Sequence, residues 1–166
     1  MSRLEKEYIT KIENTSNYGL LKEGAQLYDE QRILNEYLLN FKIYKIRCIS
    51  VKHVGIAGIR ILHKDRITYQ DVKTIDISVN ELNGEEEEIT LEQNEIINEV
   101  IIWKDEALRG FEIKTNRGRT KTFGWCGEGT KVELDELDNG KNYLVGFFFG
   151  FHKKDGIQSM GIYHNR

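Results

Sequence analysis

A weak internal repeat constrains the fold of this chain more than any other feature. Three six-residue stretches begin at Ile56, Leu108 and Ile157. In each stretch the six successive positions are apolar, variable, small, apolar, variable and isoleucine. Their starts are 52 and 49 residues apart, and each follows an apolar, strand-like segment across a short polar turn. Because self-similarity at a nearly fixed period indicates repeated structural units, we expect three related hairpins that share one core.

Apolar residues recur at every second position over much of the chain. The alternation is clearest at 45–51, 59–63, 75–79 and 111–115. It predicts strands with one face on a core and the other in water. The chain has fifteen glycines and no proline, so glycine supplies the turns and bulges, as is typical of many short strands with tight connections. The sequence therefore predicts an all-β fold.

One segment, 26–40, comes close to helical spacing. A short amphipathic helix near residues 27–39 and an irregular strand pair fit this segment equally well. The apolar residues that would form the stripe are Leu27, Ile33, Leu34, Tyr37, Leu38 and Leu39.

Composition and charge exclude several function classes. The formal net charge is −3 with both signs interspersed, whereas a nucleic-acid binder would carry a basic surplus. No apolar run approaches the ~20 residues that span a bilayer, and no secretory signal follows Met1. Two cysteines, Cys48 and Cys126, do not make a disulfide framework. We therefore expect a cytoplasmic protein that binds no nucleic acid and does not insert into membranes.

The residues that usually carry catalysis or bind metals do not cluster in this sequence. The four histidines are scattered, and neither cysteine has a partner at ligand spacing. The glycine-rich run 127–131 lacks the spacing of a phosphate loop. Adjacent acids such as Asp135 and Glu136 would alternate across a strand instead of converging. We expect no enzyme activity, no metal site and no cofactor.

The second half of the chain carries an ordered set of motifs. Residues 108–120 read Leu-Arg-Gly-Phe-Glu-Ile-Lys-Thr-Asn-Arg-Gly-Arg-Thr, with Phe123-Gly124 after them, and the chain closes with Leu-Val-Gly-Phe at 144–147 and Ile-Gln-Ser-Met-Gly-Ile-Tyr at 157–163. In order and spacing this set resembles the jacalin-like lectin family. The resemblance implies a β-prism of three four-stranded antiparallel sheets with pseudo-threefold symmetry. It places this domain at 19–166, after an N-terminal segment, 1–18, that is extended or partly disordered.

The resemblance also implies carbohydrate binding without a cofactor or catalysis. Family members hold a sugar between a glycine-rich N-terminal loop and a G-x-x-x-D motif, because a carboxylate accepts strong hydroxyl hydrogen bonds and glycine permits close approach. Here Lys154 stands at the glycine position and Gln158 at the aspartate position. We therefore predict a modified sugar site, built from Gly24, Lys154, Asp155, Gly156 and Gln158.

A second hypothesis is an intracellular protein-interaction or targeting domain, on a β-prism whose sugar site has decayed. The lost aspartate and the missing signal and disulfides motivate it. Its candidate partner contacts are Trp125 and Phe148, two aromatics that need not face the core. A phosphate ligand on the turn 152–154 is a variant of this hypothesis, although a solvated turn is the simpler interpretation. Either a carbohydrate or a protein is thus the expected partner, and homo-oligomerisation stays open.

Overall fold

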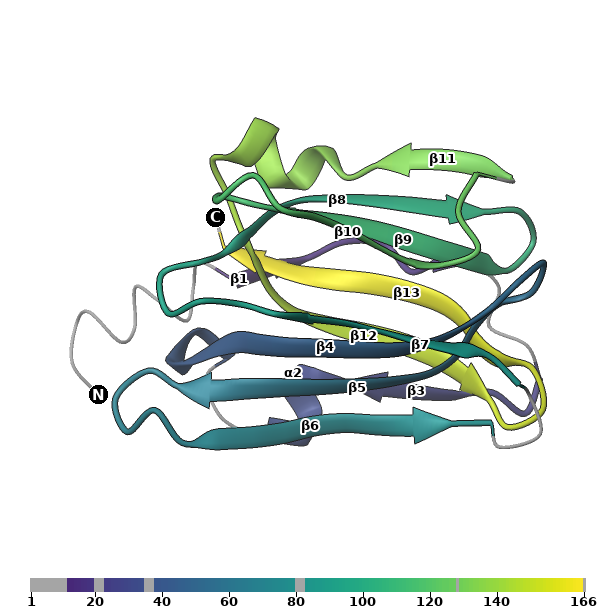
Figure 1. Cartoon of the computed structure of the whole chain (residues 1–166), viewed down its shortest axis with the longest axis horizontal. Coiled ribbons are helices and arrows are strands. Elements are labelled where there is room, and N and C mark those ends of the chain that lie inside the picture. The colour runs from purple at the N-terminus through teal and green to yellow at the C-terminus, as the bar shows by residue number, and fades with distance from the viewer. Residues whose placement is uncertain (1–11, 20–22, 35–37, 80–82, 128, 166) are drawn as a thin grey trace.

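A computed structural model describes residues 12–19, 23–34, 38–79, 83–127 and 129–165. Strands dominate these residues, and three short helices accompany them (Figure 1). The strands are β1 (Ile12–Asn14), β2 (Tyr18–Gly19), β3 (Gln26–Asp29), β4 (Phe41–Val51), β5 (Gly55–Asp65), β6 (Asp71–Ser78), β7 (Glu85–Thr90), β8 (Ile97–Lys104), β9 (Leu108–Thr115), β10 (Thr120–Gly124), β11 (Thr130–Glu133), β12 (Leu144–His152) and β13 (Gly156–Asn165). The helices are α2 (Glu30–Leu34), η1 (Leu38–Asn40) and η2 (Asp135–Gly140). The prediction of an all-β fold is confirmed.

The three repeated stretches form three antiparallel hairpins, as the repeat predicted. They are β4–β5, β8–β9 and β12–β13, and in each of them the repeated pattern lies at the start of the second strand. Figure 1 places all three hairpin turns at the same end of the molecule, its right-hand end in that view. We call this the turn end, and the opposite end the closed end.

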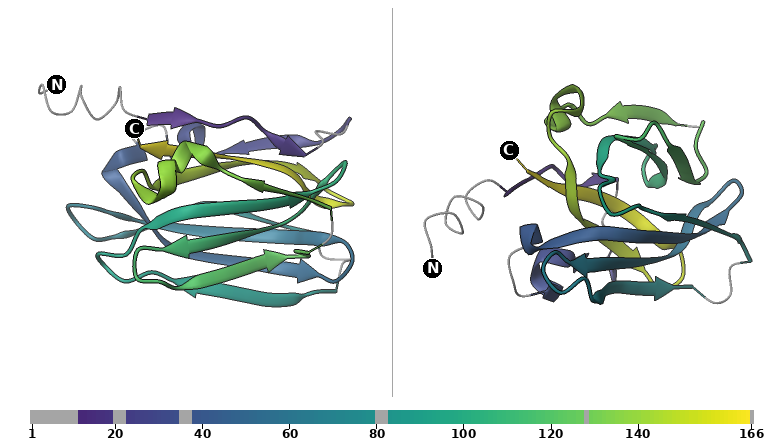
Figure 2. Two further views of the ribbon diagram at one scale, coloured as in Figure 1. Left: turned by 90° about the horizontal axis from the view of Figure 1, so that it is seen from above. Right: turned by 60° about the vertical axis from the view of Figure 1, so that its left-hand side comes forward.

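Hydrogen bonding joins the strands into two sheets. One has nine strands, with β3-β12-β13-β5-β4-β7 as its path, and the other has four in the order β10-β9-β8-β11. The expected three separate four-stranded sheets are therefore not confirmed in that form. The physical reason is a single junction, Ile157 beside Ile56, through which β13 pairs with β5 and fuses two strand groups. Figure 2 shows the β8–β11 group and the group containing β6 on opposite sides of the core.

The core follows from the alternation along the strands. Inward-facing residues of all three hairpins form one apolar cluster, which includes Ile46, Ile61, Ile102, Phe111 and Phe147. Two small residues of the repeat lie where chains pass closely. A Cβ on Gly58 would stand 2.7 Å from the Cβ of Ser78, and one on Gly110 would stand 2.7 Å from the Sγ of Cys126. Larger side chains at these positions would push neighbouring strands apart.

Among its described residues, the segment 26–40 contains one strand and two short helices, and no strand pair within the segment. β3 is a strand along β12, and α2 and η1 are the short helices. Leu38 and Leu39 of η1 form a small apolar cluster with Val145, on which Tyr143 and Tyr163 pack. Residues 35–37 lie outside the described residues. The predicted short helix is confirmed, at Glu30–Leu34.

Two buried acids anchor the closed end. Glu30 of α2 is fully buried and accepts hydrogen bonds from Thr74 Oγ1 and from the Phe147 amide at 2.8 Å, with His63 Nε2 at 2.5 Å. Glu95, between β7 and β8, is also fully buried and bonds to Thr115 Oγ1 at 2.6 Å and to Arg119. Burying a carboxylate without hydrogen-bond partners is very unfavourable. The hydrogen bonds that Glu30 and Glu95 accept therefore offset the cost of burying them.

The predicted boundary between residues 18 and 19 stays a prediction. Residues 1–11 lie outside the described residues, and Ile12–Asn14 form β1 along β13. No helix among the residues that the structure describes is long and apolar enough to cross a bilayer.

Candidate functional site

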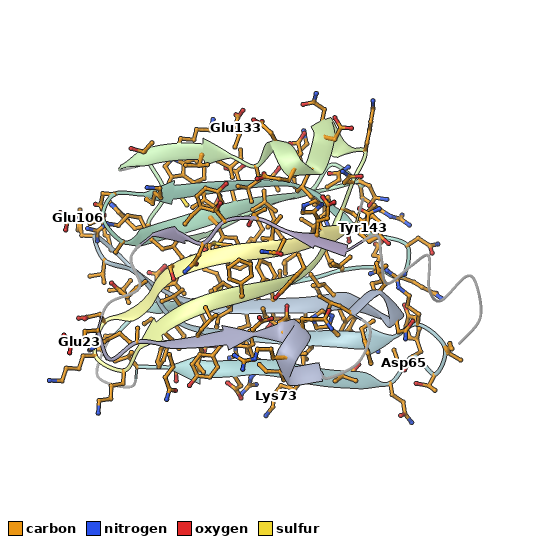
Figure 3. The ribbon with its side chains drawn as sticks, turned by 180° about the vertical axis from the view of Figure 1, so that it is seen from behind. Glu23, Asp65, Lys73, Glu106, Glu133 and Tyr143 are labelled. Atoms are coloured by element: carbon orange, nitrogen blue, oxygen red, sulfur yellow. The ribbon has the colours of Figure 1, made fainter. Side chains whose placement is uncertain are left out.

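The structure brings Gly24 and the β12–β13 turn together at the turn end. β3 pairs with β12 up to Gln26 beside Phe151, so Gly24 lies just beyond the last pair, next to His152. A Cβ on Gly24 would stand 3.8 Å from His152 Nε2, and Gly24 has a φ of +84°, which favours glycine. Figure 3 shows the neighbouring Glu23 at the same end as Glu106 of the β8–β9 turn, opposite Asp65 and Tyr143.

The β12–β13 turn is organised around the imidazole of His152. The Asp155 amide donates to the His152 carbonyl oxygen at 3.1 Å, and the Lys154 amide donates to His152 Nδ1 at 3.2 Å. The Asp155 carboxylate lies 3.3 Å from the same Nδ1. The ring edge with Nε2 therefore points toward Gly24, while the other edge is held by the turn.

Gln158, at the position of the family's aspartate, is turned inward. It is only 7% exposed, and its Nε2 donates to the Asp155 carbonyl oxygen at 3.0 Å. Gly156 is buried, and a Cβ there would lie 2.5 Å from the Ile56 carbonyl oxygen of β5. Both residues thus shape the turn from its inner side, whereas Lys154 is exposed and the Asp155 side chain is 43% exposed.

The site can recognise hydroxyl groups. Asp155 offers a carboxylate oxygen as a strong acceptor, His152 Nε2 can donate or accept, and exposed Gly24 leaves room for a ring to approach. From the sequence, His152 is assigned to a solvated turn and is not included in the predicted sugar site. The signal that could have singled it out is its position three residues before Asp155, across a tight turn.

The two candidate partner contacts lie in different surroundings. Trp125 follows β10, is partly exposed, and has its ring centroid 4.4 Å from that of His53. Phe148 is 7% exposed, and its ring packs over Gly161 and edge-on against Tyr163. As partner contacts both stay predictions, and Phe148 has little surface to offer.

Two observations in the described part of the chain concern metal binding and thiol reactivity. No group of three or more His, Cys, Asp or Glu side chains there could hold a metal ion. Burial raises the pKa of the Cys126 thiol to about 12, so this thiol stays protonated and weakly nucleophilic near neutral pH.

Comparisons with known proteins give a family from a family model and a shared fold from solved structures. The family model described as "Jacalin-like lectin domain" matches residues 39–163. Among solved structures, the chain is similar to frutapin, a lectin from Artocarpus incisa, with 16% identity, a TM-score of 0.70, and coverage of 94% of this chain and 98% of that chain. It is also similar to artocarpin complexed with Me-alpha-mannose (18% identity, TM-score 0.70, coverage 94% and 99%) and to single-chain recombinant jacalin (18%, 0.71, 98% and 99%). A search of curated proteins gave no match.

Proposed function

Because this chain belongs to the jacalin-like lectin family, we propose that it is a non-catalytic carbohydrate-binding module with a modified sugar site. The site lies where Gly24 meets the β12–β13 turn. The observation that carries this proposal is the approach of Gly24 to His152 in a turn that also holds Asp155 partly exposed.

In this site the acceptor carboxylate comes from Asp155 instead of from the position of Gln158. Gln158 bonds to the Asp155 backbone and positions the turn, and His152 supplies the second polar group. Lys154, in place of a glycine, contributes an exposed ammonium group at the rim. Hydrogen bonds to a charged group contribute about 1.5–3 kcal/mol each, so one carboxylate sustains modest but specific saccharide binding.

The ligand class that we propose is a neutral saccharide, with mannosides as the first choice. A similar structure is that of artocarpin in complex with Me-alpha-mannose, and another is of its mannotriose complex. We extend this ligand class to the present chain on family membership and on the hydroxyl-binding chemistry of the turn.

The architecture proposed with this function is a β-prism with pseudo-threefold symmetry over residues 19–166. Its support is that each of the three hairpins is the centre of a wider strand group: β12–β13 with β3 and β1, β5–β4 with β6 and β7, and β9–β8 with β10 and β11.

The test is a titration of ¹⁵N-labelled protein with a saccharide panel, followed by amide shifts. The panel contains the methyl α-glycosides of mannose, glucose and galactose, N-acetylglucosamine, and mannotriose. We expect shifts at Gly24 and at 152–158, and at least a tenfold loss of affinity in Asp155→Ala.

The matched control is Glu106→Ala, which removes an exposed acid at the same end and leaves affinity unchanged. A panel without shifts, or an Asp155→Ala variant that binds as well as the parent, contradicts the proposal. Shifts that appear only after a protein partner is added would support the protein-interaction hypothesis instead.

A further inference from the structure

Ile67 stands almost free of the rest of the fold, at the tip of the turn between β5 and β6. It is 94% exposed, the largest fraction among the exposed large apolar side chains of the described residues, and Tyr69 in the same turn is 39% exposed. Figure 1 shows this turn at the closed end, opposite the three hairpin turns. Single exposed apolar residues are common on protein surfaces, so the way in which the turn presents Ile67 decides what it can do.

Hydrogen bonds hold this turn in one conformation. Asp65 Oδ1 accepts the Ile67 amide at 2.8 Å and the Thr68 amide at 3.0 Å. The Asp65 amide donates to the Gln70 carbonyl oxygen at 3.0 Å, and the Tyr69 amide donates to the Asp65 carbonyl oxygen at 2.9 Å. Tyr69 has a φ of +62°, a left-handed conformation that these bonds maintain. A side chain whose backbone is already fixed loses less entropy on binding, so Ile67 is preorganised as an anchor.

The same turn presents a cation and an anion beside Ile67. Arg66 is exposed and donates from Nε to the Leu39 carbonyl oxygen at 2.9 Å, but forms no ion pair with any described residue. Burial and the nearby positive charge of Arg66 lower the pKa of Lys42 to about 8. Hydrogen bonds from the Thr68 and Ile67 amides lower the pKa of Asp65, so this carboxylate is charged near neutral pH. We call residues 65–69 the knob.

A hollow of about 490 Å³ lies at the opposite end of the molecule, the turn end. It opens between the end of β4, the start of β7 and the end of β10. Trp125 forms an aromatic wall and is only half-buried, and Val54 in the adjacent β4–β5 turn is 40% exposed. We call this hollow the socket and define it by Lys52, Glu85 and Trp125. It is partly apolar and has room for a side chain from outside.

The charges of the socket complement those of the knob. Glu85 and Lys52 are exposed, and neither forms an ion pair with any residue that the structure describes. Another lining acid, Glu87, already pairs with Lys121 at 3.7 Å. The knob and the socket thus each carry one unpaired cation and one unpaired anion. Electrostatic complementarity of this kind favours the matching partner and disfavours others.

We propose that the knob of one copy of this chain inserts into the socket of a second copy, so that copies associate end to end. Ile67 packs on the Trp125 ring, Arg66 pairs with Glu85, and Asp65 pairs with Lys52. The proposal does not depend on saccharide binding.

The positions of the knob and the socket determine the form of the assembly. Because they lie at opposite ends, the contact is heterologous, and every pair of copies keeps one free knob and one free socket. Contacts of this kind extend into open rows unless a rotation closes them. One turn buries less surface than the roughly 1,200–2,000 Å² of a stable interface, so the association is weak and depends on concentration.

The test is sedimentation velocity at protein concentrations that rise into the millimolar range. We expect the parent chain to form dimers and then larger species. Ile67→Ser removes the anchor and Glu85→Lys reverses the acid of the socket, and each variant alone should associate at least tenfold more weakly. Both substitutions change exposed side chains, and dispersed amide signals in NMR spectra check that each variant is folded.

Mixing the two variants gives the sharpest result. Ile67→Ser keeps an intact socket and Glu85→Lys keeps an intact knob, so an equimolar mixture should form dimers and stop there. The matched control is Ile33→Ser, which removes another exposed isoleucine, 44% exposed on α2, and should associate like the parent.

A parent chain that stays monomeric at every concentration overturns the proposal. Association of Ile67→Ser that equals that of the parent overturns the role of the knob, and so does an equal loss in Ile33→Ser. Species larger than dimers in the mixture overturn the end-to-end arrangement.

Discussion

The two ends of this molecule differ in how far their polar side chains are buried and paired. At the closed end Glu30 and Glu95 are fully buried, and each accepts hydrogen bonds from residues distant in sequence. At the turn end Lys52, Glu85, Lys153 and Lys154 are exposed and have no ion-pair partner among the described residues. We therefore expect the closed end to stabilise the fold, and we propose the turn end as the ligand-binding end. Substitutions at the two ends should therefore change different measurements.

The largest effect is expected from His63→Ala at the closed end. This substitution removes a fully buried imidazole in contact with Glu30 Oε2, and the lost hydrogen bond together with the cavity that it leaves costs about 3–5 kcal/mol. Urea unfolding should show a loss of this size, while saccharide affinity of the folded protein stays unchanged. A loss below about 1 kcal/mol would contradict the role that we give to Glu30.

A smaller effect, with a pH signature, is expected from Glu95→Gln. Hydrogen bonds from Arg119 lower the pKa of Glu95 to about 2 from 4.5, so its contribution is fully present above pH 4.5 and is lost as the pH falls through about 2. We expect a loss of about 2 kcal/mol at pH 7. The difference between parent and variant in urea unfolding should narrow steadily between pH 4.5 and 2, and a difference independent of pH would refute the assignment.

At the turn end, Gly24→Ala should affect binding as well as stability. An alanine at a φ of +84° costs about 1–2 kcal/mol, and its Cβ stands beside His152, where the saccharide is expected. NMR titration should give at least a fivefold loss of saccharide affinity at the β12–β13 turn. Gly118→Ala is the matched control, since Gly118 has a φ of +76° and open space around it. Equal losses of saccharide affinity in Gly24→Ala and Gly118→Ala would show that Gly24 has no special role in binding.

The smallest effect is expected from Asp76→Asn on the outer face of β6. Asp76 pairs with Arg60 and Lys73, but all three side chains are well exposed. Exposed pairs contribute roughly 0–1 kcal/mol and are screened by salt. Unfolding in low and high salt should differ little between parent and variant. A loss similar to that of His63→Ala would show that surface charge contributes as much as the closed end.

The strands could be predicted from the sequence because their signal is local. Alternation along 45–51 or 111–115 is visible within a few residues, and the repeat that begins at Ile56, Leu108 and Ile157 gave the three hairpins. The closed-end networks could not be predicted in this way. Glu30 meets His63 and the Phe147 amide across separations of 33 and 117 residues, and no local pattern records such a meeting.

The location of the candidate site stays a prediction, and the orientations of its side chains could not be read from the sequence. The family motif located the turn and Gly24, and the structure brings them together. It did not foresee that Gln158 would point inward to the Asp155 carbonyl oxygen, or that His152 would lie beneath Gly24. These orientations depend on how β3 lies along β12 and on backbone hydrogen bonds within one turn, which a list of residue types does not specify.

The pairing of β13 has a consequence for how the chain folds during synthesis. β1, β2, β5 and β12 all pair with β13, which is synthesised after each of them. At a synthesis rate of about 5–20 residues per second, the first strands wait on the order of ten seconds for this partner. Until then β1 and β2 lack this partner, while the β4–β5 and β8–β9 hairpins can already form. Pairings that join distant parts of a chain are slow to form. Nascent chains are therefore expected to depend on chaperone protection over that interval.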